Sequence, residues 1–255
     1  MNIVFDLDGT ICFKGNPVSE TILQVLEQAQ EQGNKIIFAS ARPIRDMLPV
    51  LDSRFHAYPM IGGNGSLTSE RGILTNKTAF SLHQREIINH LLESQNAAYL
   101  VDGEWDYSYT GPADHPILSK VDPGNLAKNI PIEQHPSIVK ALILFADDMD
   151  LFPRELEEID VVIHRHSEEN VLDISPENVD KHTALKMLGI DEYIAFGNDA
   201  NDIQMFKNAR HSVMVGHHDG LAPFASEEIT LEGDFEAVIA ERIAQLGTVR
   251  EGSKM

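Results

Sequence analysis

The sequence predicts an α/β protein whose parallel sheet is built from both ends of the chain, with a smaller α+β domain inserted between them. Apolar, strand-like runs alternate with amphipathic helices near the N-terminus, and the same alternation returns after Lys181. Hairpin signals mix with helices in the stretch between. A chain of 255 residues is long enough for two such domains. We assign residues 1–79 and 171–255 to the core and residues 80–170 to the inserted domain.

The N-terminal end of the chain predicts a strand–helix–strand unit. The apolar runs 3–5 and 35–39 are typical of strands that are buried on both faces of a parallel sheet. Between them, residues 19–32 carry apolar side chains at helical spacing, with Ser19 as N-cap and Gly33 as the C-terminal stop. Because two consecutive parallel strands need a crossover connection, this pattern indicates a βαβ unit.

The next elements along the chain are a helix at 44–51 and a short strand at 58–61. The middle of the chain then predicts helices and strands in mixed order: helices at 83–95 and 151–159, and strands at 97–101, 106–110, 139–145, 161–164 and 171–174. Asp102-Gly103 is a hairpin turn signal, so we expect an antiparallel sheet in this part.

The βα rhythm resumes in the C-terminal part of the chain. Its predicted elements are helix 181–188, strand 193–196, helix 203–209, strand 212–215 and helix 235–246. These elements complete the parallel sheet that the N-terminal unit begins.

The composition excludes several classes of function. Asp and Glu number 40 against 20 Lys and Arg, which gives a formal net charge of −20. Such a surface repels phosphate backbones, so we expect no nucleic-acid partner. With 42% hydrophobic and 24% charged residues, the chain has the composition of an ordinary globular protein.

The sequence also indicates where the protein works. Cys12 is the only cysteine, so an intramolecular disulfide is impossible and nothing favours an oxidising compartment. The N-terminus has no basic region before its first acid, and no apolar run approaches the roughly 18–20 residues that span a bilayer. We expect a soluble cytoplasmic protein with no membrane partner and no obligate protein partner.

Two carboxylates follow the first predicted strand, where the site of an open α/β sheet lies. Asp6 and Asp8 are two positions apart on an extended backbone, so their side chains point the same way. Because like charges repel, a divalent cation would relieve the crowding, and hard oxygen ligands suit Mg²⁺. One carboxylate could also act as nucleophile and its neighbour as general acid/base. The simpler alternative is that one of the two caps the next helix.

Polar residues follow two further predicted elements. Ser40 ends the second strand, where its hydroxyl can hold a phosphate oxygen or simply cap the helix after Pro43. Lys181 opens a helix, which the helix dipole disfavours. This position would be explained if the positive charge of Lys181 compensates a bound anion and a cluster of carboxylates. The alternative is an ordinary solvated lysine.

The segment Gly197–Asp202 follows a clean apolar strand and is rich in oxygen ligands. Gly197 permits a tight turn, and Asn198, Asp199 and Asp202 are candidate ligands for a metal ion. The alternative is a loop rich in Asn and Asp with a helix cap.

Four motifs in this order resemble those of the haloacid dehalogenase superfamily. The run Asp6-Leu7-Asp8-Gly9-Thr10 is similar to its first motif, Asp-x-Asp-Gly-Thr, and Ser40 matches its strand-end Ser/Thr. Lys181 matches the lysine motif, and Gly197–Asp202 matches the terminal Gly-Asp-x-x-Asn-Asp motif. The resemblance covers nearly the whole chain and implies a Rossmann-like core.

The spacing of the motifs resembles the Cof-like branch of that superfamily. Only the stretch between Arg42 and Lys181 has room for an inserted cap domain, as in that branch. The run Ile61-Gly62-Gly63-Asn64-Gly65 is similar to the branch's Asn-Gly entry to the cap. Three positions depart from the usual pattern: Asn198 replaces an Asp that is a metal ligand in the family, and Ala41 and His182 each replace a Gly.

The resemblance implies the roles of the carboxylates. Asp6 would attack phosphorus and form an aspartyl-phosphate, while Asp8 would protonate the leaving alcohol and then deprotonate water. Mg²⁺ would be held by the Asp6 carboxylate, the Asp8 backbone carbonyl and Asn198, with Asp202 assisting. An Asn carbonyl oxygen can bind Mg²⁺ but adds no charge, so Asp199 is an alternative ligand.

The resemblance also implies how substrate is held. Ser40 and Lys181 would bind the phosphoryl oxygens, and Arg42 and Asn201 would contact phosphate or substrate. The cap domain would close over the site and supply specificity.

These inferences predict a phosphoric monoester hydrolase: a Mg²⁺-dependent phosphatase for small phosphorylated metabolites, either sugar phosphates or nucleotide- or cofactor-type monophosphates. Asp8 favours phosphate esters over haloacids, because a dehalogenase has no alkoxide to protonate. The alternatives are a phosphosugar mutase of the same superfamily and a non-catalytic regulatory protein that retains the fold.

Overall fold

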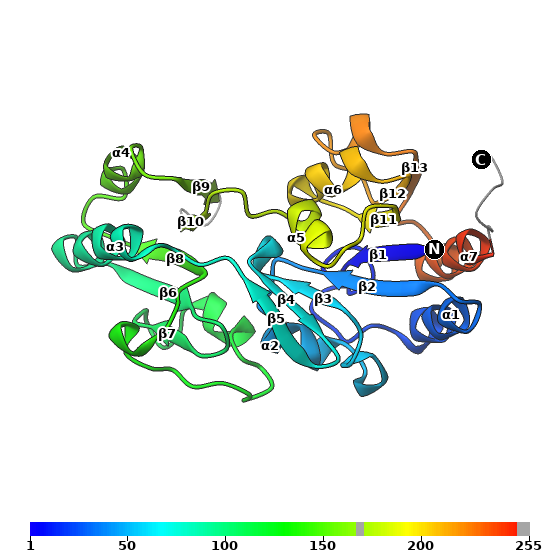
Figure 1. Cartoon of the computed structure of the whole chain (residues 1–255), viewed down its shortest axis with the longest axis horizontal. Helices are drawn as coiled ribbons and strands as arrows, with labels where there is room; N and C mark the ends of the chain where they lie inside the picture. Colours follow the sequence, from blue (N-terminus) through cyan, green and yellow to red (C-terminus); the bar gives the residue numbers. More distant parts are fainter. Residues whose placement is uncertain (167–170, 249–255) are drawn as a thin grey trace. The chain divides into compact units, whose positions relative to one another are not determined.

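The computed structural model describes residues 1–166 and 171–248, which form two compact units. One unit contains Met1–Thr75 and the described residues from Asp180 onward, and the other contains the described residues between Asn76 and Val179. Each unit has its own sheet (Figure 1). This confirms the predicted fold class, a parallel α/β core with a separate antiparallel sheet. Within the described ranges, no helix is both long and apolar enough to cross a membrane.

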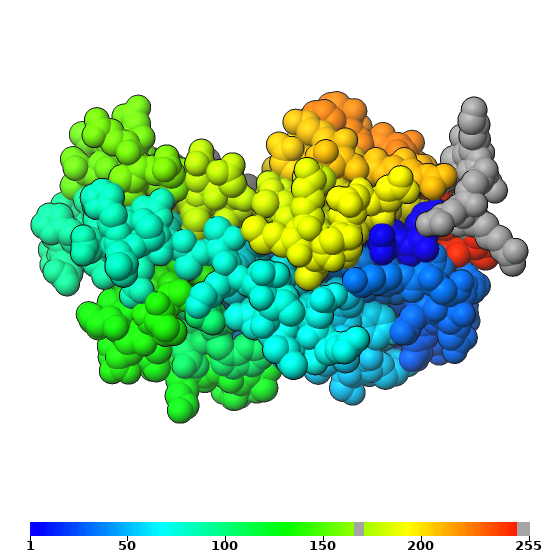
Figure 2. All heavy atoms as spheres, viewed as in Figure 1, coloured from blue at the N-terminus to red at the C-terminus, as the bar shows by residue number. Residues whose placement is uncertain are grey.

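The sheet of the first unit is built from both ends of the chain. Its strand order is β13-β12-β11-β1-β2-β3-β4-β5. The strands are β1 (Asn2–Asp6), β2 (Lys35–Ala39), β3 (Met60–Gly62), β4 (Leu67–Glu70), β5 (Ile73–Lys77), β11 (Tyr193–Gly197), β12 (His211–Val215) and β13 (Glu227–Ile229). The pairs from β13 to β3 are parallel, and β3 pairs with β4 in the antiparallel sense. In Figure 2 the dark-blue N-terminus accordingly lies against the returning yellow segment.

Helices cover this sheet. They are α1 (Glu20–Glu31), α2 (Ile44–Met47), α5 (Lys181–Met187), α6 (Ile203–Asn208) and α7 (Phe235–Gly247). Helices α5 and α6 pack their apolar side chains on strand residues of one face, so that Leu185 and Phe206 share a core with Val4 and Ala195. Helix α1 packs against α7, and the two contact β2 and β13 respectively (Figure 1).

The second unit is an antiparallel sheet with helices. Its strands are β6 (Ala98–Asp102), β7 (Tyr107–Tyr109), β8 (Lys140–Phe145), β9 (Val161–His166) and β10 (Val171–Pro176), in the order β7-β6-β8-β10-β9. Helices α3 (Leu82–Ser94) and α4 (Leu151–Leu156) pack on it around a core that includes Val101, Ile143 and Leu172. We predicted that the inserted domain ends at residue 170, which lies outside the described residues. The next strand, β10, pairs with β8 and β9 and so is part of this second sheet.

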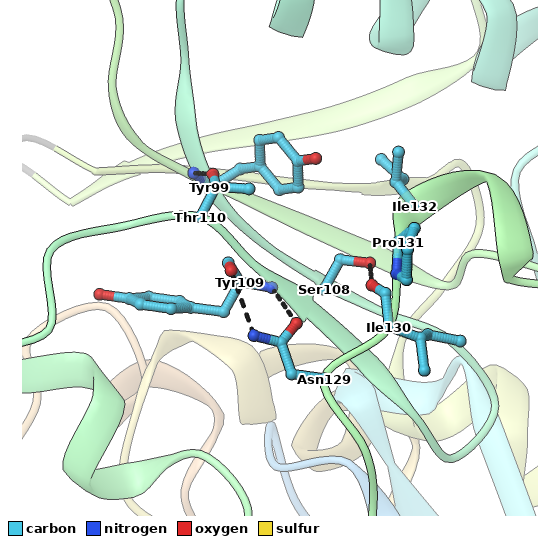
Figure 3. Close-up of a pocket in the computed structure, with 8 residues that line it drawn as sticks. All are labelled: Tyr99, Ser108, Tyr109, Thr110, Asn129, Ile130, Pro131 and Ile132. Atoms are coloured by element: carbon cyan, nitrogen blue, oxygen red, sulfur yellow. Dashed lines mark hydrogen bonds between the residues drawn. The ribbon is translucent and has the colours of Figure 1, made fainter.

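The edge of this second sheet at β7 is covered by the segment around Asn129, whose backbone pairs with Tyr107 and whose side chain pairs with Tyr109. The Asn129 amide accepts from the Tyr109 backbone N–H at 2.9 Å and donates to the Tyr109 carbonyl at 3.3 Å (Figure 3). Asn129 thereby takes the place of a neighbouring strand, which protects an otherwise open edge. A cavity of about 260 Å³ lies beside it, lined by residues that include Tyr99 and Thr110.

The structure differs from the prediction in short elements. The predicted helix 44–51 ends as α2 at Met47 and continues as a 3₁₀ turn, because Pro49 has no N–H to extend the helix. The hairpin β4–β5 and strand β13 were not predicted. Arg71 and Gly72 both have positive φ (55° and 73°), which is typical of a two-residue hairpin turn.

Candidate active site

The polar ends of three neighbouring strands meet at one edge of the core sheet. Asp6 closes β1, Ser40 directly follows β2, and Asn198 directly follows β11. Because β1 pairs in parallel with both β2 and β11, their carboxyl ends lie side by side. The start of α5 adds Lys181 to this group, through its contact with Asp6.

Lys181 links two buried carboxylates. Its Nζ donates to Asp6 Oδ1 at 2.6 Å and to Asp202 Oδ1 at 2.7 Å, and the lysine is 0% exposed. The alternative of a solvated lysine is therefore wrong. Burial raises the pKa of Asp6 to about 7, since desolvation outweighs the opposing effect of Lys181. Burial opposes the charge of Lys181 too, but the two carboxylates raise its pKa above the ordinary value.

The start of α5 is fixed by two local features. The Asp180 carboxylate caps the helix, accepting from the Thr183 backbone N–H at 2.9 Å and from its hydroxyl at 2.8 Å. Gly65, with φ +119°, lies so close to the helix start that a Cβ there would be 2.3 Å from the Asp180 carbonyl oxygen. The glycine-rich segment after β3 therefore sets the position of Lys181.

Oxygen atoms from three residues face one another beside Asp6. The Asn198 Oδ1 lies 3.0 Å from the Asp8 carbonyl oxygen and 3.1 Å from Asp6 Oδ2. It accepts a hydrogen bond from the Thr10 hydroxyl at 3.2 Å. If the Asn198 amide is turned over, its nitrogen instead donates to the same three neighbours. Converging acceptors of this kind need either a donor or a cation between them.

This oxygen set fits a magnesium ion. Adjacent oxygens around octahedral Mg²⁺ are about 2.9–3.0 Å apart, given Mg–O distances of about 2.0–2.1 Å. The separations of 3.0 and 3.1 Å among Asn198, Asp8 and Asp6 are close to that spacing. Asn198 can come this close to the loop after β1 only because residue 9 is a glycine. Gly9 has φ +82°, and a Cβ there would lie 2.2 Å from Asn198 Nδ2.

The side chains of Asp202 and Asp199 make different contacts in the loop after β11. Asp202 Oδ2 accepts from the backbone N–H groups of Asn198 at 2.9 Å and Asp199 at 3.2 Å, while its other oxygen meets Lys181. Asp199 instead caps the following turn through the Ala200 N–H and pairs with His218 at 3.3 Å. The loop thus contains the predicted helix cap, and Asn198, not Asp199, is the residue that faces Asp6.

The remaining predicted residues lie around Asp8 and the loop after β3. Arg42 forms a two-point ion pair with the Asp8 carboxylate, at 2.7 and 2.6 Å. The Ser40 hydroxyl accepts from the Arg42 backbone N–H at 3.1 Å. Asn201 Nδ2 donates to the side-chain oxygen of Asn64 at 3.0 Å.

Sequence reasoning gave no role to Thr10. Its buried hydroxyl donates to Asp6 Oδ2 at 3.0 Å and also contacts Asn198. The only signal was its place four residues after Asp6, at the end of the first motif.

The chain is similar to known proteins over most of its length. A family profile described as haloacid dehalogenase-like hydrolase matches residues 3–240. A Mycoplasma genitalium protein with a provisional name as a phosphatase is 26% identical, over 90% of this chain and 92% of that protein. The HMP-PP phosphatase of Serratia proteamaculans is 25% identical, over 84% and 82%. A crystal structure of a haloacid dehalogenase-like hydrolase from Bacteroides thetaiotaomicron has a TM-score of 0.78 at 20% identity, covering 96% of this chain and 98% of that one.

Proposed function

The chain belongs to the haloacid dehalogenase-like hydrolases, in the Cof-like branch with an inserted cap sheet, and on that premise we propose a Mg²⁺-dependent phosphatase that works through an aspartyl-phosphate on Asp6. Its substrates are small phosphorylated metabolites, either sugar phosphates or nucleotide- or cofactor-type monophosphates. The observation that carries this proposal is the buried Lys181 between Asp6 and Asp202, next to the converging oxygens of Asp6, Asp8 and Asn198.

The donor set suits the cation that the family typically uses. Asp6, the Asp8 carbonyl and Asn198 would hold Mg²⁺, with Asp202 acting through the loop amides and Lys181. When bound, Mg²⁺ neutralises charge on the phosphoryl group and on the Asp6 carboxylate.

In the first step, the Asp6 carboxylate attacks phosphorus and the bond from phosphorus to the ester oxygen breaks. Asp8, in its protonated form, gives a proton to the leaving alkoxide and becomes a carboxylate. In the second step, Asp8 takes a proton from water, and the oxygen of that water attacks phosphorus. The bond to Asp6 breaks, which frees the Asp6 carboxylate and inorganic phosphate.

Lys181 and Ser40 would stabilise the charge on the transferred group. A lysine ammonium has three N–H bonds, and Asp6 and Asp202 use two of them. In this proposal the third donates to a phosphoryl oxygen. The Ser40 hydroxyl accepts from the Arg42 backbone and keeps its own hydrogen to donate. Such fixed donors stabilise a transition state because they need no rearrangement during the reaction.

A metabolite panel tests this function. We expect release of inorganic phosphate from at least one sugar phosphate or nucleotide- or cofactor-type monophosphate, dependent on Mg²⁺ and lost in Asp6→Asn. Free phosphate as the main product would exclude a mutase, which returns the phosphoryl group to a second hydroxyl. A folded protein with no Asp6-dependent activity on the whole panel would contradict the proposal.

A further inference from the structure

We infer that Arg42 is a positioning residue for Asp8: it holds the carboxylate that transfers protons, and the phosphoryl group is bound by other residues. This inference rests on the proposed function, because it concerns how the general acid/base is aimed. It also revises the prediction that Arg42 contacts phosphate or substrate.

The contact between Arg42 and Asp8 is the two-point type that fixes an orientation. Arg42 Nε donates to Asp8 Oδ2 at 2.7 Å, and Nη2 donates to Asp8 Oδ1 at 2.6 Å. Two parallel N–H···O bonds from a planar guanidinium fix both the distance and the plane of a carboxylate. A lysine at this position could fix only the distance, because its ammonium is a point charge.

Arg42 is itself held at three points. Its backbone N–H donates to the Ser40 hydroxyl at 3.1 Å, and its carbonyl accepts from the Gly63 N–H at 2.8 Å. Its Nη1 donates to the Asp46 carbonyl at 3.2 Å, in the first turn after Pro43. Gly62 allows this close packing, since a Cβ there would lie 3.0 Å from the Arg42 carbonyl oxygen. The guanidinium is therefore anchored before it meets Asp8.

Asp8 needs such support. It lies beyond the end of β1, and its side chain is 47% exposed, whereas the Asp6 side chain is 5% exposed. Apart from Arg42, its carboxylate contacts only the Cys12 thiol, at 3.9 Å, among the hydrogen bonds of the described residues. Without Arg42 the carboxylate would rotate freely, and small losses of orientation are costly in proton transfer.

A double-mutant cycle separates positioning from phosphate binding. With para-nitrophenyl phosphate, we expect Arg42→Gln to slow single-turnover hydrolysis of the aspartyl-phosphate, the step in which Asp8 acts as a carboxylate base, by about 10- to 100-fold. In an Asp8→Asn background the same substitution should change the rate by less than about twofold, because the group it orients is gone. Equal losses in both backgrounds would overturn the inference.

Two further readouts use defined probes. With para-nitrophenyl phosphate, whose leaving group needs no proton, Arg42→Gln should keep the initial burst of nitrophenolate but lose steady-state turnover, which needs Asp8 as a base. The inhibition constant for inorganic phosphate should stay within about twofold of wild type. A slowed burst together with a weakened phosphate inhibition would contradict positioning and support phosphate binding.

Controls make failure of the inference distinct from failure of the proposed function. Arg54→Gln removes an arginine that pairs with Glu20 and Asp52 at the surface, and we expect it to leave all three readouts unchanged. Arg42→Lys keeps the charge and serves if Arg42→Gln does not fold, with a loss smaller than that of Arg42→Gln. One outcome is that Asp6→Asn abolishes turnover while the effects of Arg42→Gln and Asp8→Asn on the rate simply add. That result would support the proposed phosphatase and would contradict only the role given to Arg42.

Discussion

At the residue scale, chemistry depends on side chains that reach one another from distant parts of the chain. The sequence predicted Asp6, Lys181 and Asn198 as members of one site, because each sits at the end of a strand or the start of a helix. The contacts of Thr10 with Asp6 and of Arg42 with Asp8 could not be predicted. They depend on side-chain rotamers and on the packing of loops, which periodicity does not report.

Asn198→Asp tests whether this residue faces the cation. We expect Mg²⁺ to bind roughly tenfold more tightly, because a hard cation prefers a charged oxygen ligand. Without Mg²⁺ the variant should melt at a lower temperature than wild type, since the new carboxylate would lie beside Asp6 Oδ2, 3.1 Å from the present oxygen. Thermal melting over a Mg²⁺ titration measures both effects.

Asp199 provides the matched control for this experiment. Its side chain is exposed and pairs with His218, so Asp199→Asn should leave the Mg²⁺ midpoint unchanged. An unchanged midpoint in Asn198→Asp, or a shifted one in Asp199→Asn, would show that the loop binds the cation differently.

At the scale of elements, long apolar runs were predictable and short exposed pieces were not. The runs that became β1, β2 and β11 are buried over most of their length, so their apolar character is strong. Strand β5 is largely exposed and β13 has three residues, so neither has a clear pattern. The glycine-rich segment after β3 was predicted only by resemblance, and its packing role depends on the start of α5.

Gly65→Ala tests that packing role. Gly189 is the matched control, because its φ is also positive, at +69°, but a Cβ there meets nothing within 4 Å. We expect Gly189→Ala to lower the free energy of unfolding by about 1–2 kcal/mol, the cost of a left-handed backbone for alanine. Gly65→Ala should lose about 1–3 kcal/mol more, because a φ of +119° lies outside the left-handed region that alanine can adopt and because its Cβ would overlap the Asp180 carbonyl. Urea unfolding of both variants measures the difference, and equal losses would mean that the segment yields without displacing α5.

At the scale of the whole molecule, the net charge of −20 opposes an anionic substrate. In the proposed function, bound Mg²⁺ together with Lys181 would reverse that field at the site. Lys181 is charged and buried between two carboxylates, and the oxygens beside Asp6 fit a divalent cation. Composition predicted that polyanions are excluded as partners, whereas the convergence of three strand ends is what would allow the proposed small phosphate ester to bind.

The most direct test of the central claim is to trap the phosphorylated aspartate. The Asp8→Asn variant is mixed with para-nitrophenyl phosphate and Mg²⁺, quenched in acid, digested and analysed by mass spectrometry. We predict one phosphoryl group on the peptide that contains Asp6. Hydroxylamine should remove this group, and a variant that carries both Asp6→Asn and Asp8→Asn should lack it. Release of phosphate without any label on Asp6, or a label on another residue, would contradict the proposed mechanism.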